Sequence, residues 1–439
     1  MPSLRHIFTG TDKTFPDALT PESRLQGRKL FYRFYVLNGV SVACLMNNVL
    51  ILYGIRNGLA DPTVAIMASF LHLTMPFMIL GKSAIARIGA ARTRAMGWFF
   101  RYVFASLMVL APFAARSSPQ PVVTALILVG AFGFAAFRSI GVAAINPLQG
   151  EVAEANEGGK MVSTILLCVQ STYFLCLVLI LFGFHHTDEI WLYQVILATG
   201  CIVGLYASTI VAMVPESNAT RISARKSLRD ILRVTFATRS YRRLVSAWSA
   251  GLAAKALVIP FTMIALKSGY GVSDFMAMLL TLVMALGTVA SGYFTKKFAD
   301  RVGARFILLI HIVGMMAITG FWAFAPATFF PLAIGTVFFL AGYCEIGIAI
   351  GLSQHFLEVV PGEDRVGSSL LMRIASGASA GLAASVLGAG LLRILPDLGF
   401  EGLDIYRRYF LIILVPLALL FLIIGRIESH RLAPSVQEL

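Results

Sequence analysis

Polar side chains that lie deep within apolar runs are the residues of this sequence best suited to chemistry. An ionisable group away from water is costly unless it is paired or hydrated, so such groups usually mark a functional site. The members of this set are Asn47, Asn48, His72, Arg101, Arg138, Lys255, Glu345 and Arg373. An arginine can hold a carboxylate or a phosphate through two parallel hydrogen bonds, whereas a lysine acts as a point charge.

Glu345 is the only acidic residue expected at this depth, and three roles are open to it. Burial favours the protonated form of a carboxyl group, and a nearby cation favours the ionised form. A residue that alternates between those surroundings would carry a proton across the membrane. The alternatives are a static ion pair with Lys255 or Arg373 and a role as a Na+ ligand.

Membrane-spanning helices are the elements that must position these groups. The chain has 439 residues, of which 58% are apolar and 13% charged, and its mean hydropathy is +0.80. This composition excludes a water-soluble enzyme, a nucleic-acid binder and a disordered scaffold. Because a helical span takes about 20 apolar residues, we predict an all-α polytopic membrane protein. The twelve predicted spans are 33–55, 62–80, 95–115, 122–145, 162–184, 191–214, 243–266, 275–295, 306–324, 329–352, 368–393 and 409–426.

The distribution of Lys and Arg predicts the orientation of these spans. With a cytoplasmic N-terminus, 26 of these residues fall on the cytoplasmic side and six on the opposite side. The positive-inside rule therefore places both termini in the cytoplasm, and it accounts for the net charge of +14 without a nucleic-acid partner. No removable signal peptide is expected. Because arginine outnumbers lysine 27 to 9, a bacterial inner (plasma) membrane is the expected location of this multi-pass protein.

Three of the polar residues have simpler interpretations than a binding site. Arg101 and Arg373 fall about one and a half turns inside the cytoplasmic edge of their predicted spans, so we expect them to snorkel to the lipid headgroups. His72 either forms a pH-sensitive gate or hydrogen-bonds a neighbouring helix.

The order of the spans predicts two halves joined by a basic linker. We expect a cytoplasmic segment (1–32), a six-helix bundle (33–214), a linker (215–242), a second six-helix bundle (243–426) and a cytoplasmic tail (427–439). The linker has apolar residues at helical spacing among arginines, so it either lies on the membrane as an amphipathic helix or simply joins the halves.

The two halves repeat weakly. RIGAAR at 87–92 corresponds to RVGARF at 301–306, and SIGVAA at 139–144 corresponds to EIGIAI at 345–350. Both pairs are separated by close to half the chain length, which predicts two pseudo-symmetric bundles.

FADRVGAR carries the strongest similarity to a known family. Its residues Asp300, Arg301, Gly303 and Arg305 fit the loop pattern Asp-Arg-x-Gly-x-Arg/Lys of the major facilitator superfamily, and Arg138 and Gly141 resemble that family's signature in span four. In the first half, Ala86 stands where the pattern has its aspartate. The sequence resembles this family over nearly its whole length.

The resemblance implies a twelve-helix facilitator fold in which spans one, four, seven and ten line a central cavity. Those spans carry the predicted solute-binding residues Asn47, Asn48, Arg138 and Lys255 and the predicted coupling residue Glu345. Because the cations outnumber the acid, an anionic or zwitterionic solute is favoured. The loop residues Asp300, Arg301, Gly303 and Arg305 are expected to form a gating charge network or else a plain polar turn. His72 and Arg373 are further candidates.

The expected function is secondary active transport of a small solute by alternating access, driven by a proton or sodium gradient, in a monomer within the lipid bilayer. No resident cofactor and no catalytic activity are expected. A receptor or scaffold without flux, a drug or amphiphile exporter, and an integral membrane enzyme are the alternatives. The enzyme would need a catalytic constellation that one isolated Glu345 does not supply.

Three local patterns resemble catalytic or metal motifs. Gly377-Ala378-Ser379-Ala380-Gly381 matches GxSxG, but we expect helix packing there because that nucleophile needs a strand–turn–helix elbow. Gly81-Lys82-Ser83 lacks the first glycine of a phosphate loop. No metal site is expected from the external loop with His185 and His186 or from the five cysteines, which lie in apolar stretches without paired spacing.

Overall fold

The computed structural model describes residues 15–45, 48–115, 117–153, 158–225, 233, 238–360 and 365–426. These residues form helices and the turns between them, with no strand. Twelve helical stretches in the described part of the chain are long and apolar enough to cross a membrane. The predicted all-α membrane protein with twelve spans is therefore confirmed.

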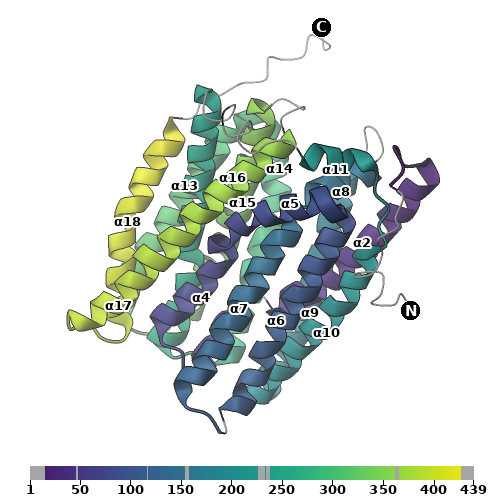
Figure 1. Ribbon diagram of the computed structural model, residues 1–439. Coiled ribbons are helices and arrows are strands. Elements are labelled where there is room, and N and C mark those ends of the chain that lie inside the picture. The colour runs from purple at the N-terminus through teal and green to yellow at the C-terminus, as the bar shows by residue number, and fades with distance from the viewer. Residues whose placement is uncertain are drawn as a thin grey trace. The chain divides into compact units, whose positions relative to one another are not determined.

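The chain divides into two compact units, Met1–Asp230 and Ile231–Leu439, and Figure 1 shows the helices of each. The helices of the first unit are α2 (Pro21–Leu45), α3 (Asn48–Arg56), α4 (Asp61–Leu73), η1 (Met75–Phe77), α5 (Met78–Ile88), α6 (Ala90–Ala114), α7 (Gln120–Val142), α8 (Ile145–Val152), α9 (Gly158–His186), α10 (Ile190–Ala212) and α11 (Asn218–Ala224). Six candidate spans run through them, the first formed by α2 with α3 and the second by α4, η1 and α5.

The second unit carries the other six candidate spans. Its helices are α13 (Arg239–Ile264), η2 (Ala265–Gly269), α14 (Asp274–Ala323), α15 (Pro331–Val359), α16 (Arg365–Leu382), η4 (Ala383–Gly388), α17 (Ala389–Asp397) and α18 (Leu403–Gly425). The range α14 comprises two helices, spans eight (Asp274–Phe294) and nine (Val302–Ala323), and the backbone between them is not helical at Gly303.

Several helices extend beyond the apolar runs that predict them. The first helix begins at Pro21, well before position 33, and its side chains Phe31 and Phe34 are fully buried. Similarly, α6 begins at Ala90 rather than 95. Arg101 is consequently the twelfth residue of this 25-residue helix, close to its middle.

Small residues bring neighbouring helices close together within each unit. In the first unit, α6 and α7 run side by side (Figure 1), and a Cβ atom added to Gly97 would lie 2.9 Å from the Cα of Gly141. In the second unit, Gly287 of α14 and Gly342 of α15 each face the backbone of the other helix. Close backbone approach at small residues is the usual packing of membrane helices, because lipid provides no hydrophobic driving force between them.

Three spans contain a local change of helix type. Pro76 lies in the 3₁₀ segment η1 between α4 and α5, where it interrupts the α-helical hydrogen bonds. The π-helical segment η2 ends the span that contains α13, and η4 interrupts the span that contains α16 and α17. Such segments frequently occur at functional sites.

Candidate functional site

Lys255 and Glu345 form an ion pair in the second unit. The Nζ atom of Lys255 lies 3.1 Å from Oε1 of Glu345. Lys255 belongs to α13 and Glu345 to the middle of α15, so the pair joins spans seven and ten. Of the two partners that the sequence left open for Glu345, the structure places Lys255 against it.

The faces of α13 and α15 explain why these two side chains meet. Trp248, Gly251 and Lys255 lie on one face of α13, at helical spacing. The indole nitrogen of Trp248 donates a hydrogen bond of 3.2 Å to the backbone oxygen of Leu352. A Cβ atom on Gly251 would lie 3.1 Å from Ile348. The small residue thus lets α15 approach, and the ion pair lies one to two turns further along the same contact.

The ion pair is only partly covered by protein. The side chains of Lys255 and Glu345 are 20% and 29% exposed. A charged pair at this depth would be costly against lipid, whereas water or a polar solute can hydrate it. The pair is therefore not fully enclosed by the protein.

The first unit carries the other predicted solute-binding residues. Arg138 lies near the end of α7 and is half-buried. Asn48 is the buried first residue of α3, at the junction between the two helices of span one. Asn47 falls outside the described residues.

A pair of buried hydroxyl groups lies beside Arg138. The side-chain oxygens of Thr74 and Ser139 are 3.1 Å apart, which links the end of α4 to α7. His72 is half-buried in the last turn of α4, directly before the break at η1. The predicted gating role of His72 remains a prediction, as does snorkelling of the half-buried Arg373 in α16.

The prediction that Arg101 snorkels to the headgroups is wrong. Its side chain is 1% exposed, and its guanidinium carbon lies 4.0 Å from the ring centre of Phe134 in α7. The helix begins at Ala90, five residues before the predicted span, so Arg101 lies farther from the end of the helix than predicted. Arg94, which directly precedes the predicted third span, is equally buried, and its guanidinium carbon lies 4.1 Å from the ring centre of Trp98.

Glycines of the two repeated loops have nearly the same backbone conformation. Gly89 has φ 89° and ψ 166°, and Gly303 has φ 77° and ψ 157°. Only glycine adopts this region readily, so each copy of the repeat turns the chain at the same point. Of the predicted gating residues, Arg305 is half-buried, and the side chains of Asp300 and Arg301 lie outside the described part of the chain.

Glu216 contacts the first of these turns, and the sequence reasoning missed it. Its Oε2 atom accepts a hydrogen bond of 2.5 Å from the backbone N–H of Ala90, at the N-terminus of α6. A carboxylate is favourable there because the first turn of a helix has unpaired N–H groups and a partial positive charge. The first-half loop has Ala86 in place of an aspartate, so Glu216 supplies an acidic group at this loop from another segment.

Glu151 makes a second carboxylate contact at the same end of the unit. It accepts hydrogen bonds of 2.5 Å from the hydroxyl groups of Ser217 and Thr220. Arg221 donates a 3.0 Å hydrogen bond to the backbone oxygen of Arg87. Residues near 215–221, which we assigned to the linker, thus fasten α8 and the turn before α6. Polar residues in a charged loop resemble a solvated surface, so the sequence carries no signal for these contacts.

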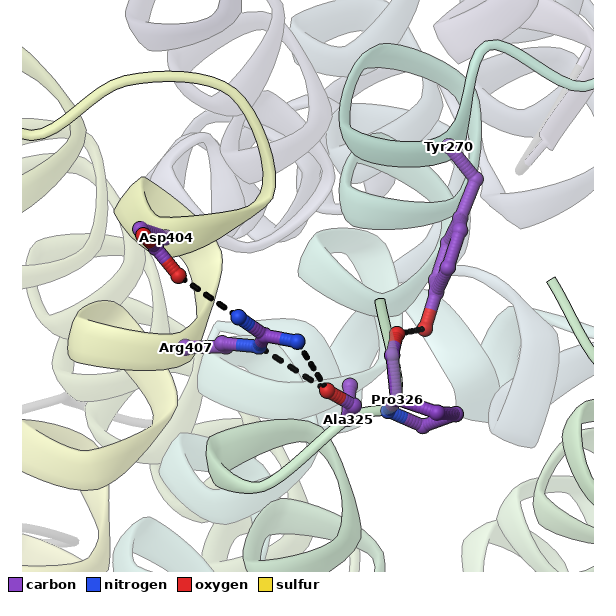
Figure 2. A network of polar contacts seen from close by, with 5 residues as sticks. All are labelled: Tyr270, Ala325, Pro326, Asp404 and Arg407. Carbon is purple, nitrogen blue, oxygen red and sulfur yellow. Dashed lines mark hydrogen bonds and ion pairs between the residues drawn. The ribbon is translucent and has the colours of Figure 1, made fainter. Parts of the chain in front are cut away.

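Figure 2 shows a separate polar network in the second unit, which joins α18 and Tyr270 to the segment that follows α14. Two guanidinium nitrogens of Arg407 donate to the backbone oxygen of Ala325, at 2.9 and 2.6 Å, and a third lies 2.7 Å from the Asp404 carboxylate. The hydroxyl of Tyr270 donates to the oxygen of Pro326 at 2.6 Å. Burial raises the pKa of the Tyr270 phenol, and the positive charge of Arg407 partly opposes this increase.

The catalytic-looking motifs do not form catalytic geometry. Residues 377–381 lie within α16, and the Ser379 hydroxyl donates to the oxygen of Ala375 one turn earlier, as serines in helices commonly do. Among the described residues, no group of three or more His, Cys, Asp or Glu side chains could hold a metal ion. The five cysteines are free thiols.

The protein resembles known proteins in its three-dimensional structure. No family model and no curated protein matches the sequence. The structure resembles the nucleoside transporter NupG, with a TM-score of 0.68 and 14% identity over 92% of this chain and all of NupG. It also resembles the peptide transporter POT, with a TM-score of 0.61 and 12% identity over 92% of this chain and 93% of POT. A third similar structure is the E. coli fucose:proton symporter FucP, with a TM-score of 0.59 and 14% identity over 93% of this chain and all of FucP.

Proposed function

We propose that this chain, which has the fold of the major facilitator superfamily, is a secondary active transporter of a small anionic or zwitterionic organic solute. The observation that carries the proposal is the partly exposed Lys255–Glu345 ion pair near the middle of the second bundle. The solved structures of the same fold include transporters of nucleosides and peptides and a fucose:proton symporter, which supports transport as the activity.

The preference for an anionic group follows from the charges at the predicted binding positions. Arg138 in the first unit and Lys255 in the second supply two cations, and Glu345 supplies one anion. A negatively charged solute is attracted to a cation at either position, and the attraction is strengthened where water is partly excluded. Arg138 would bind a carboxylate or phosphate through two hydrogen bonds.

Competition for Lys255 couples solute binding to proton uptake. While Lys255 contacts Glu345, the positive charge of the ammonium group balances the negative charge of the carboxylate. A solute anion that binds Lys255 draws this cation away, and Glu345 then takes up a proton. After release of the solute on the other side, Lys255 returns to Glu345 and displaces the proton. One proton therefore accompanies each solute in the same direction.

Uptake into proteoliposomes tests this mechanism. The purified protein is reconstituted, and accumulation of labelled organic anions is measured with and without an inward proton gradient. We expect Glu345→Gln to abolish accumulation against the solute gradient, because a neutral amide carries no proton. The same variant should retain exchange of labelled for unlabelled solute, since exchange requires no net proton movement.

Glu189→Gln is the matched control, because it makes the same change on an exposed side chain at the start of α10. Its accumulation should equal that of the unchanged protein. If Glu345→Gln still concentrates solute against its gradient, Glu345 is not the proton carrier. Tight binding of a solute without flux would favour the receptor, and outward pumping of amphiphilic cations would favour the drug exporter.

The proposed cellular setting is a monomer in a bacterial inner membrane with both termini in the cytoplasm. The 26-to-6 distribution of Lys and Arg supports this orientation. A proton gradient is proposed as the driving force, and replacement of Na+ by K+ in the uptake assay should leave accumulation unchanged.

A further inference from the structure

Arg101 and Tyr102 place three polar atoms inside the first helical bundle. Arg101 is 1% exposed and Tyr102 is 0% exposed, near the middle of α6. Within the described residues, the Nε and Nη2 atoms of Arg101 are buried and have no hydrogen-bond partner, and the buried hydroxyl of Tyr102 interacts with Ser41. All three are hydrogen-bond donors, so the cluster requires acceptors.

Aromatic rings cover the faces of the Arg101 guanidinium but leave its edge unsatisfied. Its central carbon lies 4.0 Å from the ring centre of Phe134, 5.1 Å from that of Trp98 and 5.3 Å from that of Tyr102. Such ring faces attract a cation. The N–H bonds, however, lie in the guanidinium plane and point outward from its edge, where a negatively charged acceptor is the strongest partner.

No carboxylate of the described residues neutralises this charge. In the second unit, Lys255 is paired with Glu345 and Lys267 with Asp274. In the first unit, neither Arg94 nor Arg101 has an ion pair in the described part of the chain. An arginine does not lose its proton in a protein, so this positive charge persists and burial makes it costly.

We infer that Arg101 and Tyr102 bind a small anion within the first bundle. The ligand is a compact, negatively charged group that accepts hydrogen bonds from the Arg101 edge and from the Tyr102 hydroxyl. Chloride has this chemistry, and so does a small carboxylate such as the anionic end of an organic solute. The site lies between α6 and α7, and the Tyr102 ring packs against Gly204 of α10. This inference is independent of the proposed transport activity, because it concerns binding alone.

Thermal unfolding of the full chain in detergent tests the inference. The protein is kept in potassium gluconate, whose anion is bulky, and gluconate is replaced stepwise by chloride or acetate at constant ionic strength. We expect chloride to raise Tm by about 3 °C or more, because a ligand that binds only the folded state stabilises it. A response to acetate but not to chloride would identify the carboxylate of an organic solute as the source of the anion.

Two variants locate the effect. Arg101→Met keeps an apolar shape and removes the charge, so its Tm should no longer depend on the anion. Tyr102→Phe keeps the ring and removes one donor, and we expect the chloride concentration at half-maximal effect to rise about tenfold, as for the loss of one hydrogen bond to a charged group. The Tyr102 variant keeps the test decisive if Arg101→Met does not fold.

Arg408→Gln is the control, because it removes an exposed arginine that also lies over a ring, 5.2 Å from that of Phe400. Its anion response should match that of the unchanged protein. The inference is overturned if the Tm of the unchanged protein is the same in gluconate, chloride and acetate. It is also overturned if Arg101→Met or Tyr102→Phe keeps the full response.

Discussion

Buried cations in this protein are stabilised in two different ways. Lys255 has a carboxylate partner 3.1 Å away, and both groups remain partly exposed. Arg101 is surrounded by aromatic rings and lies fully inside its bundle. The first arrangement is easily exchanged because a proton or a solute can compete for either partner, whereas the second is accessible only to a small group.

Arg138 is the residue whose replacement best tests the charge of the solute. We expect Arg138→Ala to weaken binding of an anionic solute at least about tenfold, because a charge-assisted pair of hydrogen bonds is lost. Arg138→Lys retains the charge but not the paired geometry, and its affinity should be intermediate. Binding is measured by titration of the purified protein, with helix content and elution volume as checks on folding. Unchanged affinity in Arg138→Ala would remove this residue from the site.

The sequence predicts which residues lie deep within a span, but it does not predict which residue of another span each of them contacts. The depth of Lys255 and Glu345 was readable from the apolar runs, but the sequence left Lys255 and Arg373 as equal partners of Glu345. The choice depends on which helix faces meet, and that is determined by residues such as Gly251, which leaves space for α15, and Trp248, which hydrogen-bonds to it. Arg101 was misplaced because an apolar run does not show where a helix begins.

Turns between helices are the elements in which the internal repeat is most visible. Gly89 and Gly303 share a positive φ, but among the described side chains one lies over Gly89 alone, the Glu216 carboxylate that caps α6. A Cβ atom on Gly303 would meet nothing within 4 Å. The same substitution at the two glycines therefore separates backbone strain from loss of the cap.

We expect Gly303→Ala to destabilise the protein by about 1–3 kcal/mol, because its backbone conformation (φ 77°, ψ 157°) is essentially restricted to glycine. Gly89→Ala should cost more, because the added methyl group also displaces Glu216 from Ala90, and loss of a cap costs about 1 kcal/mol further. Thermal unfolding of the two variants under identical conditions gives the comparison. Equal or reversed losses would show that the Glu216 contact contributes nothing to stability.

The network around Arg407 makes a pH-dependent prediction for the second unit. The pKa of Tyr270 is raised by burial, so the unfolded chain releases this proton at a lower pH than the folded protein does. The stabilising contribution of Tyr270 is therefore complete below its ordinary pKa near 10 and is lost as the pH rises above it. We expect the Tm difference between the unchanged protein and Tyr270→Phe to shrink between pH 8 and pH 11. A constant difference would contradict the prediction.

At the scale of the whole molecule, hydropathy and charge predicted the number of spans, since a helix must satisfy its own backbone in lipid. Span ends were less predictable, because helices such as α2 continue past the apolar run into polar sequence. The contacts of Glu216 and Glu151 with distant turns could not be anticipated, since nothing local in the chain encodes them.

Reporter fusions test the orientation of the whole chain. A reporter that is active only in the periplasm is fused after residue 60, and another after residue 220. We expect activity from the first position alone, because the second lies on the side with most of the Lys and Arg residues. Activity from the second fusion would reverse the proposed orientation.

The two buried arginines of α6 have a consequence for how the protein is made. The 18-residue apolar window within Ala90–Ala114 has a mean hydropathy of 1.4, the lowest among the twelve candidate spans of the described residues. A central arginine opposes partition from the translocon into lipid by about 2.5–3.5 kcal/mol. The rings of Phe34 and Phe134, which shelter Arg94 and Arg101, belong to spans one and four. During synthesis on the ribosome, span three should therefore remain at the insertion channel until span four has been made. Spans three and four should then enter the lipid together.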